Sequence, residues 1–206
     1  MARTADAMIL LWAVLGGLVA SLVRAWLLGH QLHPPNLRLV WLVPVAFLPQ
    51  FVAFQVPGTR AQISETSAAL ALVSSQALLL VFAWVNRDLP GFWALGLGLV
   101  LNLSVIVLNG GLMPISPETV KRLAPDAPAG SWQVGSRLGT GKDVVLPVAA
   151  TRLWWLSDRF LVPAWLPYRV AFSIGDVLIA AGAFWLLWST SGESAGARTR
   201  KVMSKA

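Results

Sequence analysis

Apolar residues gather along this chain into five runs separated by short polar stretches. Each run is about 20 residues long, and a membrane-spanning helix needs roughly 17 to 25 mostly apolar residues. The pattern therefore predicts an all-α polytopic transmembrane helix bundle with five spanning helices, over residues 8–28, 39–56, 66–85, 91–108 and 169–188.

Composition supports this interpretation. Of the 206 residues, 56% are hydrophobic and 12% charged, and the mean hydropathy is +0.67, far from an average soluble domain. Eleven Trp stand against one Tyr, many near the ends of the apolar runs, as in the aromatic belt at membrane interfaces. The absence of cysteine excludes disulfides and Cys-ligated metals. We expect a multi-pass integral membrane protein.

Several positions refine the predicted helices. The small residues Ala13, Gly17 and Ser21 recur every four positions and permit close helix packing. A cleaved signal peptide is the alternative for this first run, although no clear cleavage site follows it. Asn102 and Asn109 lie seven residues apart on one helical face, which favours hydrogen bonds between helices over a catalytic role.

The segment 109–168 is rich in Pro, Gly and charge, and we expect most of it outside the hydrocarbon. Its apolar part, 144–156, is too short to span and contains Pro147 and Arg152, so it predicts an interfacial or re-entrant piece packed on protein. The expected organisation is four helices in 1–108, an extracytoplasmic segment in 109–168, a fifth helix in 169–188 and a basic cytoplasmic tail in 189–206.

Charge predicts the orientation. If five helices alternate, Arg24, Arg38 and Arg87 lie on the same side as the tail, and that side should be cytoplasmic. The amino terminus and the long segment then lie outside. The net charge of +7 favours anionic lipids near the basic tail as a partner over nucleic acid. The tail's basic residues are Arg198, Arg200, Lys201 and Lys205.

Two aspartates are the candidate catalytic residues. Asp176 lies within an apolar run, where a carboxylate is costly and is by default a functional hypothesis. A hairpin through Pro163, Trp165 and Pro167 could bring Asp158 to a similar depth. Two close carboxylates can divide the roles of acid and base, which an aspartic hydrolase requires.

The alternative for both aspartates is structural. Asp158 could pair with one of the nearby arginines, and Asp176 could accept hydrogen bonds from amide or hydroxyl side chains. The candidate partners of Asp158 are Arg152, Arg159 and Arg169; those of Asp176 are Asn102, Asn109 and Ser173.

Part of this region resembles the lipoprotein signal peptidases, which are membrane aspartic proteases. The likeness lies in Asp158-Arg159, in the stretch from Phe172 to Asp176, and loosely in the Asn109-Gly110-Gly111 loop. It implies Asp158 and Asp176 as the catalytic pair, with Asn109, Arg159 and Ser173 as substrate-binding candidates. Ser173 and Gly175 stand where that family has Asn and Ala.

The chain as a whole is similar to small bacterial membrane proteins grouped as a domain of unknown function. These combine an Asn-Gly-Gly-x-Met-Pro segment, here Asn109 to Pro114, with a Ser-Ile-Gly-Asp helix, here Ser173 to Asp176. This resemblance implies a cytoplasmic-membrane location and brings no activity with it.

Other candidate sites are weak. The Gly-rich stretch from Gly135 to Asp143 departs from a phosphate loop at Ser136 and Asp143. His30 and His33 lack a third metal ligand nearby. We therefore expect no cofactor and no metal. The function expected is a structural or accessory membrane component that docks on a membrane protein partner. The alternatives are an aspartic intramembrane hydrolase and a small-solute transport component, the latter disfavoured by the absence of an internal repeat.

Overall fold

The computed structural model describes residues 5–28, 31–32, 35–128, 130–163, 169–189 and 191–192. The protein is mostly helical. Its five long helices fall on the five predicted runs: α1 (Ala5–Leu28), α2 (Leu42–Phe54), α4 (Glu65–Val85), α5 (Phe92–Leu108) and α7 (Ile174–Trp188). Among the described residues, α4 is the one helix that is both long enough and apolar enough to cross a membrane by itself.

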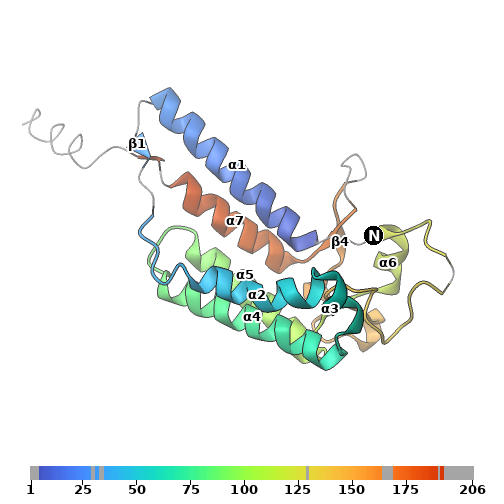
Figure 1. Ribbon diagram of the computed structural model, residues 1–206. Helices are drawn as coiled ribbons and strands as arrows, with labels where there is room; N and C mark the ends of the chain where they lie inside the picture. Colours follow the sequence, from blue (N-terminus) through green and yellow to red (C-terminus); the bar gives the residue numbers. More distant parts are fainter. Residues whose placement is uncertain are drawn as a thin grey trace, which may run out of the picture.

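The long helices lie side by side with their axes roughly aligned (Figure 1). Contacts between neighbours give the order α1, α7, α5, α4, α2. Gly17 of α1 packs closely on α7, where an added Cβ would lie 3.1 Å from the Leu187 Cβ, so the small residue predicted for close packing serves that purpose. The α2–α4 contact includes a buried hydrogen bond from the Ser75 hydroxyl to the Ala46 carbonyl.

Most of the remaining chain forms a cap at one end of the bundle. We define the cap as residues 109–163 together with 169–172. It contains β2 (Met113–Ile115), α6 (Pro117–Leu123), β3 (Asp143–Val145), the 3-10 turns η1 (Val148–Ala150) and η2 (Trp154–Leu156), β4 (Phe160–Leu161) and β5 (Ala171–Phe172). The short helix α3 (Pro57–Gln62) joins α2 to α4 at the same end (Figure 1).

Short strands organise the cap. β2 pairs in parallel with β3, with Met113 opposite Asp143, and a parallel bridge joins Ile115 to Asp158. β2 therefore lies between β3 and the extended segment at 157–158. β4 and β5 form an antiparallel pair with Phe160 opposite Phe172, which confirms the predicted hairpin; its residues 164–168 lie outside the described chain.

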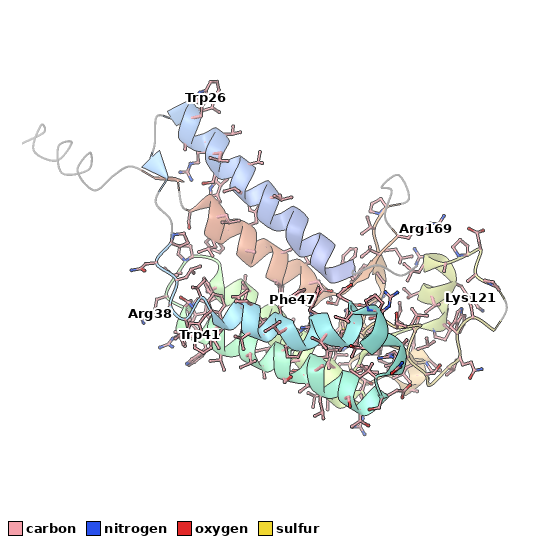
Figure 2. All side chains as sticks on the ribbon, viewed as in Figure 1. Trp26, Arg38, Trp41, Phe47, Lys121 and Arg169 are labelled. Atoms are coloured by element: carbon pink, nitrogen blue, oxygen red, sulfur yellow. The ribbon has the colours of Figure 1, made fainter. Side chains whose placement is uncertain are left out.

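The opposite end of the bundle holds the short loops. Asn86, which ends α4, accepts a 2.8 Å hydrogen bond from the Arg38 backbone N–H and donates a 2.9 Å bond to the Arg38 carbonyl. Figure 2 shows Arg38, Trp41 and Trp26 at this end, with Lys121 and Arg169 at the cap end. A two-stranded pair, β1 (Gln31–Leu32) with β6 (Ser191–Gly192), lies here as well.

The structure corrects the start of the last helix. The sequence pattern predicts a helix from residue 169, with Asp176 two turns inside it, whereas α7 begins at Ile174 and Asp176 lies in its first turn. The reason is that Ala171 and Phe172 pair with β4 as a strand, and Ser173 then caps the helix. An apolar run alone does not distinguish a buried strand from a helical turn.

Candidate functional site

Asp176 lies in a polar network between α5 and α7. Its Oδ1 accepts a 2.8 Å hydrogen bond from the Asn102 side-chain amide, and its Oδ2 accepts a 2.9 Å bond from the Ser173 backbone N–H. In return, the Asp176 N–H donates to the Ser173 hydroxyl oxygen at 3.0 Å. This reciprocal pair is a capping box, which satisfies backbone donors at the start of a helix. Asp176 therefore has the amide and serine partners predicted for a structural role.

The Ser173 hydroxyl links the cap of α7 to α5. It lies 2.8 Å from Asp176 Oδ2 and 2.9 Å from Asn102 Oδ1. A hydroxyl has one proton, so it donates to one of these two oxygens at a time. Ser173 and Asn102 are 0% and 3% exposed, and a buried network of this kind fixes the register of the two helices.

The close approach of α5 explains why the residue at position 175, between Ser173 and Asp176, is a glycine. A Cβ at this position would overlap the Asn102 side-chain amide and lie 2.8 Å from the Gly98 carbonyl oxygen. Gly98 faces it in the same way, since its own Cβ would lie 2.5 Å from the Gly175 carbonyl oxygen. The two glycines let α5 and α7 approach closely enough for the Asn102–Asp176 hydrogen bond.

Asp158 lies in the cap and is 1% exposed. Its Oδ2 forms a 2.9 Å ion pair with the Lys142 ammonium, and its backbone N–H donates to the Pro114 carbonyl at 3.1 Å. The partner that the structure shows is thus a lysine, Lys142, which was not among the predicted arginines. Arg159 instead stacks its guanidinium on the rings of Trp154 and Phe160, 4.6 and 5.3 Å from their centroids.

Asp143, Lys142 and Asp158 together form a second polar cluster, which we call the cap cluster. The Oδ1 of Asp143 lies 3.7 Å from the Lys142 ammonium, which also pairs with Asp158. Burial raises the pKa of the Asp143 carboxyl above its ordinary value. The positive charge of Lys142 lowers that pKa, and the negative charge of Asp176 raises it. The pKa of Asp143 thus depends on charges in the cap and at the start of α7.

The two aspartates predicted as a catalytic pair have separate partners. Asp158 is held by Lys142, and Asp176 is held by Asn102 and Ser173. Asp143 lies beside the same ammonium as Asp158. Chemically, each arrangement binds polar groups of the chain itself.

Asn109 fastens the cap to α5. This residue ends the helix, and its side-chain amide donates to the Val105 and Arg152 carbonyls at 2.7 and 2.9 Å. Its Oδ1 accepts a 2.9 Å bond from the Arg152 N–H. The amide is thus engaged with the chain's own backbone. The predicted helix–helix role holds for Asn102, whereas Asn109 bonds the cap.

Sequence reasoning missed Lys142 and Asp143. Both end the Gly-rich stretch that was compared with a phosphate loop. In the structure that stretch is a hairpin, in which the Leu138 N–H bonds the Asp143 carbonyl at 2.8 Å and Val145 N–H bonds the Ser136 carbonyl at 3.0 Å. The available signal was a Lys-Asp pair directly before the apolar Val144-Val145-Leu146 run, which places two charges at the start of a buried strand.

In the described part of the chain, no three His, Asp or Glu side chains are grouped so that they could hold a metal ion. The His30 and His33 pair, the tail arginines and lysines, and Trp165 and Pro167 of the hairpin lie outside the described residues.

Comparison with known proteins places the chain in a family. The model of DUF5317, a family of unknown function, matches residues 35–188. An uncharacterized protein of Thermotoga maritima is 32% identical over 112 residues, which are 52% of this chain and 55% of that protein. The chain thus spans about half the length of this relative. No solved structure matches it. The chain belongs to the DUF5317 family, an uncharacterised bacterial family.

Proposed function

We propose that this protein is a multi-pass component of the bacterial cytoplasmic membrane with a structural or accessory role, built from five membrane-embedded helices and an extracytoplasmic cap. The observation that carries the proposal is the apolar surface of the helices. Large hydrophobic side chains are exposed along every long helix, including Leu18 and Leu22 of α1, Phe47 and Phe51 of α2, Leu70 and Val81 of α4, Leu97 and Val107 of α5, and Val177 and Trp185 of α7. Soluble monomers rarely expose contiguous apolar patches above a few hundred Å².

The long helices differ in how well their lengths match the hydrocarbon thickness of a bilayer. At 1.5 Å per residue, the 21 residues of α4 span about 31 Å, close to the roughly 30 Å hydrocarbon thickness. The 17 residues of α5 reach about 25 Å and the 15 of α7 about 22 Å. The shorter helices are accommodated because irregular backbone is tolerated at membrane depth where it is buried in protein. The capped start of α7 provides such a site, since Ser173 is fully buried.

Charge supports the proposed orientation. Arg38 and Arg87 lie in the short loops at the end opposite the cap, and Arg24 reaches the same end, where its guanidinium lies 5.0 Å from the Trp188 ring centroid. An excess of arginine in short loops marks the cytoplasmic side. The cap then faces outward, and anionic lipid headgroups are the expected partners of the arginine end.

Burial of the aspartates favours the accessory role over hydrolysis. A hydrolase must bring water and substrate to its carboxyls, yet Asp158 is 1% and Asp176 9% exposed. The bonds of Asp176 hold α5 against α7, and the ion pair of Asp158 joins two parts of the cap. Both side chains serve the internal architecture that presents the cap at the membrane surface to a membrane protein partner.

An arginine scan of exposed leucine positions tests membrane insertion. Leu97 lies on α5 and is 52% exposed; in water, Leu97→Arg would be harmless or improve solubility. Facing lipid near a helix centre, an arginine costs about 2.5 to 3.5 kcal/mol on insertion scales. We expect Leu97→Arg to deplete the protein from carbonate-washed membranes. The control is Val134→Arg, at a 56% exposed position of the cap, which should behave like wild type.

Equal membrane yield of wild type, Leu97→Arg and Val134→Arg would contradict the proposal, as would release of the wild-type chain by carbonate.

A further inference from the structure

An exposed arginine of the cap is held against two aromatic rings. The Arg159 guanidinium lies 4.6 Å from the Trp154 ring centroid and 5.3 Å from that of Phe160. Within the described part of the chain, no oxygen accepts a hydrogen bond from this guanidinium and no carboxylate pairs with it. Stacking uses the flat face of a guanidinium and leaves the N–H donors at its edge available for an anion.

The two rings are themselves fixed by neighbouring residues. The Phe160 ring stacks on Phe172 across the β4–β5 pair, with the centroids 5.7 Å apart. The Trp154 carbonyl accepts hydrogen bonds from the Ser157 N–H at 3.1 Å and from the Ser157 hydroxyl at 2.6 Å. The guanidinium is therefore preorganised, and binding an anion does not require the side chain to be ordered first.

The exposed charges near this arginine are positive. The stretch 147–173 contains three arginines, which are Arg152, Arg159 and Arg169, and one acid, which is Asp158. All three arginines are exposed, whereas Asp158 is buried in the cap cluster. This part of the cap surface therefore attracts anions.

The arginine and its rings lie where the cap meets the helices. The turn η2, which includes Trp154, contacts α5, and Asn109 at the end of α5 bonds the N–H and the carbonyl of Arg152. Trp154 and Phe160 are 41% and 40% exposed. In the orientation proposed above, these rings lie at the outer boundary of the hydrocarbon, the level at which Trp is enriched and lipid headgroups are found.

We propose that Arg159 binds the phosphate of an anionic phospholipid in the outer leaflet. Two guanidinium N–H groups donate to two phosphate oxygens, a geometry that the planar fork of arginine favours, and the rings of Trp154 and Phe160 pack on the apolar part of the same lipid. A carboxylate of a partner protein would also fit the fork, but a lipid presents both an anion and apolar chains at this level. The leaflet assignment rests on the proposed function.

Native mass spectrometry of the purified full-length chain in detergent tests the site. Wild type and Arg159→Gln are mixed in one sample and compete for phosphatidylglycerol, at a concentration that gives at most one lipid adduct. We expect Arg159→Gln to bind about tenfold more weakly, as expected when one charge-assisted hydrogen bond is lost. Arg159→Lys should recover only part of the loss, because an ammonium cannot form the bidentate contact. The matched control is Arg122→Gln, at an exposed arginine in the last turn of α6, which should bind like wild type.

A second pair of variants tests the aromatic stacking. Trp154→Leu removes one ring and keeps the charge, so binding should weaken roughly threefold. Trp154→Phe keeps a ring and should restore most of the affinity. Equal affinities for these two variants would contradict the role of stacking. Unfolding midpoints close to that of wild type confirm that each variant is folded.

The choice of probe identifies the source of the anion. Inorganic phosphate at the same concentration should not displace the lipid, and diacylglycerol, which lacks the phosphate, should not distinguish wild type from Arg159→Gln. Displacement by inorganic phosphate would assign the site to free phosphate and overturn the lipid. Equal binding of phosphatidylglycerol to wild type and Arg159→Gln would overturn the site and favour a partner's carboxylate, and an equal loss in Arg122→Gln would reduce it to general attraction of anions.

Failure of this proposal is distinct from failure of the proposed function, because binding in detergent does not require a membrane. A chain that resists carbonate but binds lipid equally with and without Arg159 would contradict the lipid site alone. A chain that carbonate releases from membranes but that binds lipid through Arg159 would contradict the proposed function and the leaflet assignment.

Discussion

The α5–α7 junction and the cap cluster both bury an aspartate, but they stabilise it differently. At the junction, Asp176 accepts hydrogen bonds from neutral donors, and one of them, Ser173, is three residues away. In the cap, Asp158 is held by an ammonium 16 residues away, with a second carboxyl beside it. The junction is thus a satisfied helix cap, whereas the cap cluster depends on charge balance.

This difference has an energetic consequence. Neutral hydrogen bonds contribute about 0.5 to 1.5 kcal/mol each, and losing one leaves a modest penalty. Breaking a buried ion pair by removing one partner costs about 3 to 5 kcal/mol because a charge is left uncompensated. The cap cluster should therefore be the more fragile region.

The largest effect is expected from Lys142→Met. Removing the ammonium breaks the ion pairs that Lys142 forms with Asp158 and Asp143, so the cap should lose about 3 to 5 kcal/mol. The measurement is thermal unfolding in detergent, followed by tryptophan fluorescence. Lys142→Met combined with Asp158→Leu should recover much of the loss, because an apolar pair leaves no buried charge. A wild-type midpoint for the single variant would show that the cluster does not depend on charge balance.

An intermediate effect is expected from Gly175→Ala. The added Cβ meets the Asn102 amide and the Gly98 carbonyl, so α5 and α7 must separate, at a cost of about 1 to 3 kcal/mol. The matched control is Gly16→Ala in α1, where an added Cβ meets nothing within 4 Å; this change should be neutral or stabilising. Equal midpoints for the two variants would contradict the close approach of the helices.

The smallest effect is expected from Ser173→Ala, compared with Ser64→Ala. Both serines are N-caps whose side chains accept a backbone hydrogen bond, from Asp176 and Ser67 respectively. Loss of such a cap costs about 1 kcal/mol. Ser173→Ala should cost roughly 1 kcal/mol more, because its hydroxyl also bonds α5 through Asn102. If the exposed Ser64 is as costly to replace, the link to α5 contributes nothing.

Local patterns in the sequence predicted the five long helices, and Asn102 and Ser173 were two of the three partners predicted for Asp176. Apolar runs of spanning length located the helices. The start of α7 was predicted too early because Val170, Ala171 and Phe172 are as apolar in a strand as in a helix.

The cap cluster was not predictable in the same way. Lys142 and Asp158 meet only because β2 pairs with β3 on one side and contacts Asp158 on the other. These pairings are set by tertiary packing of very short strands, for which the sequence carries little periodic signal. The partner of a buried carboxylate is then decided by topology, and nearby arginines such as Arg159 can lie elsewhere.

The most direct test of the account is the sidedness of its two ends. In spheroplasts of an expressing bacterium, an impermeant maleimide should label Thr140→Cys in the cap, and should label Asp88→Cys, in the loop between α4 and α5, only after the membrane is opened. The cysteine-free chain supplies the background. Labelling of Asp88→Cys as fast as Thr140→Cys in intact spheroplasts would contradict a membrane-embedded bundle with an external cap.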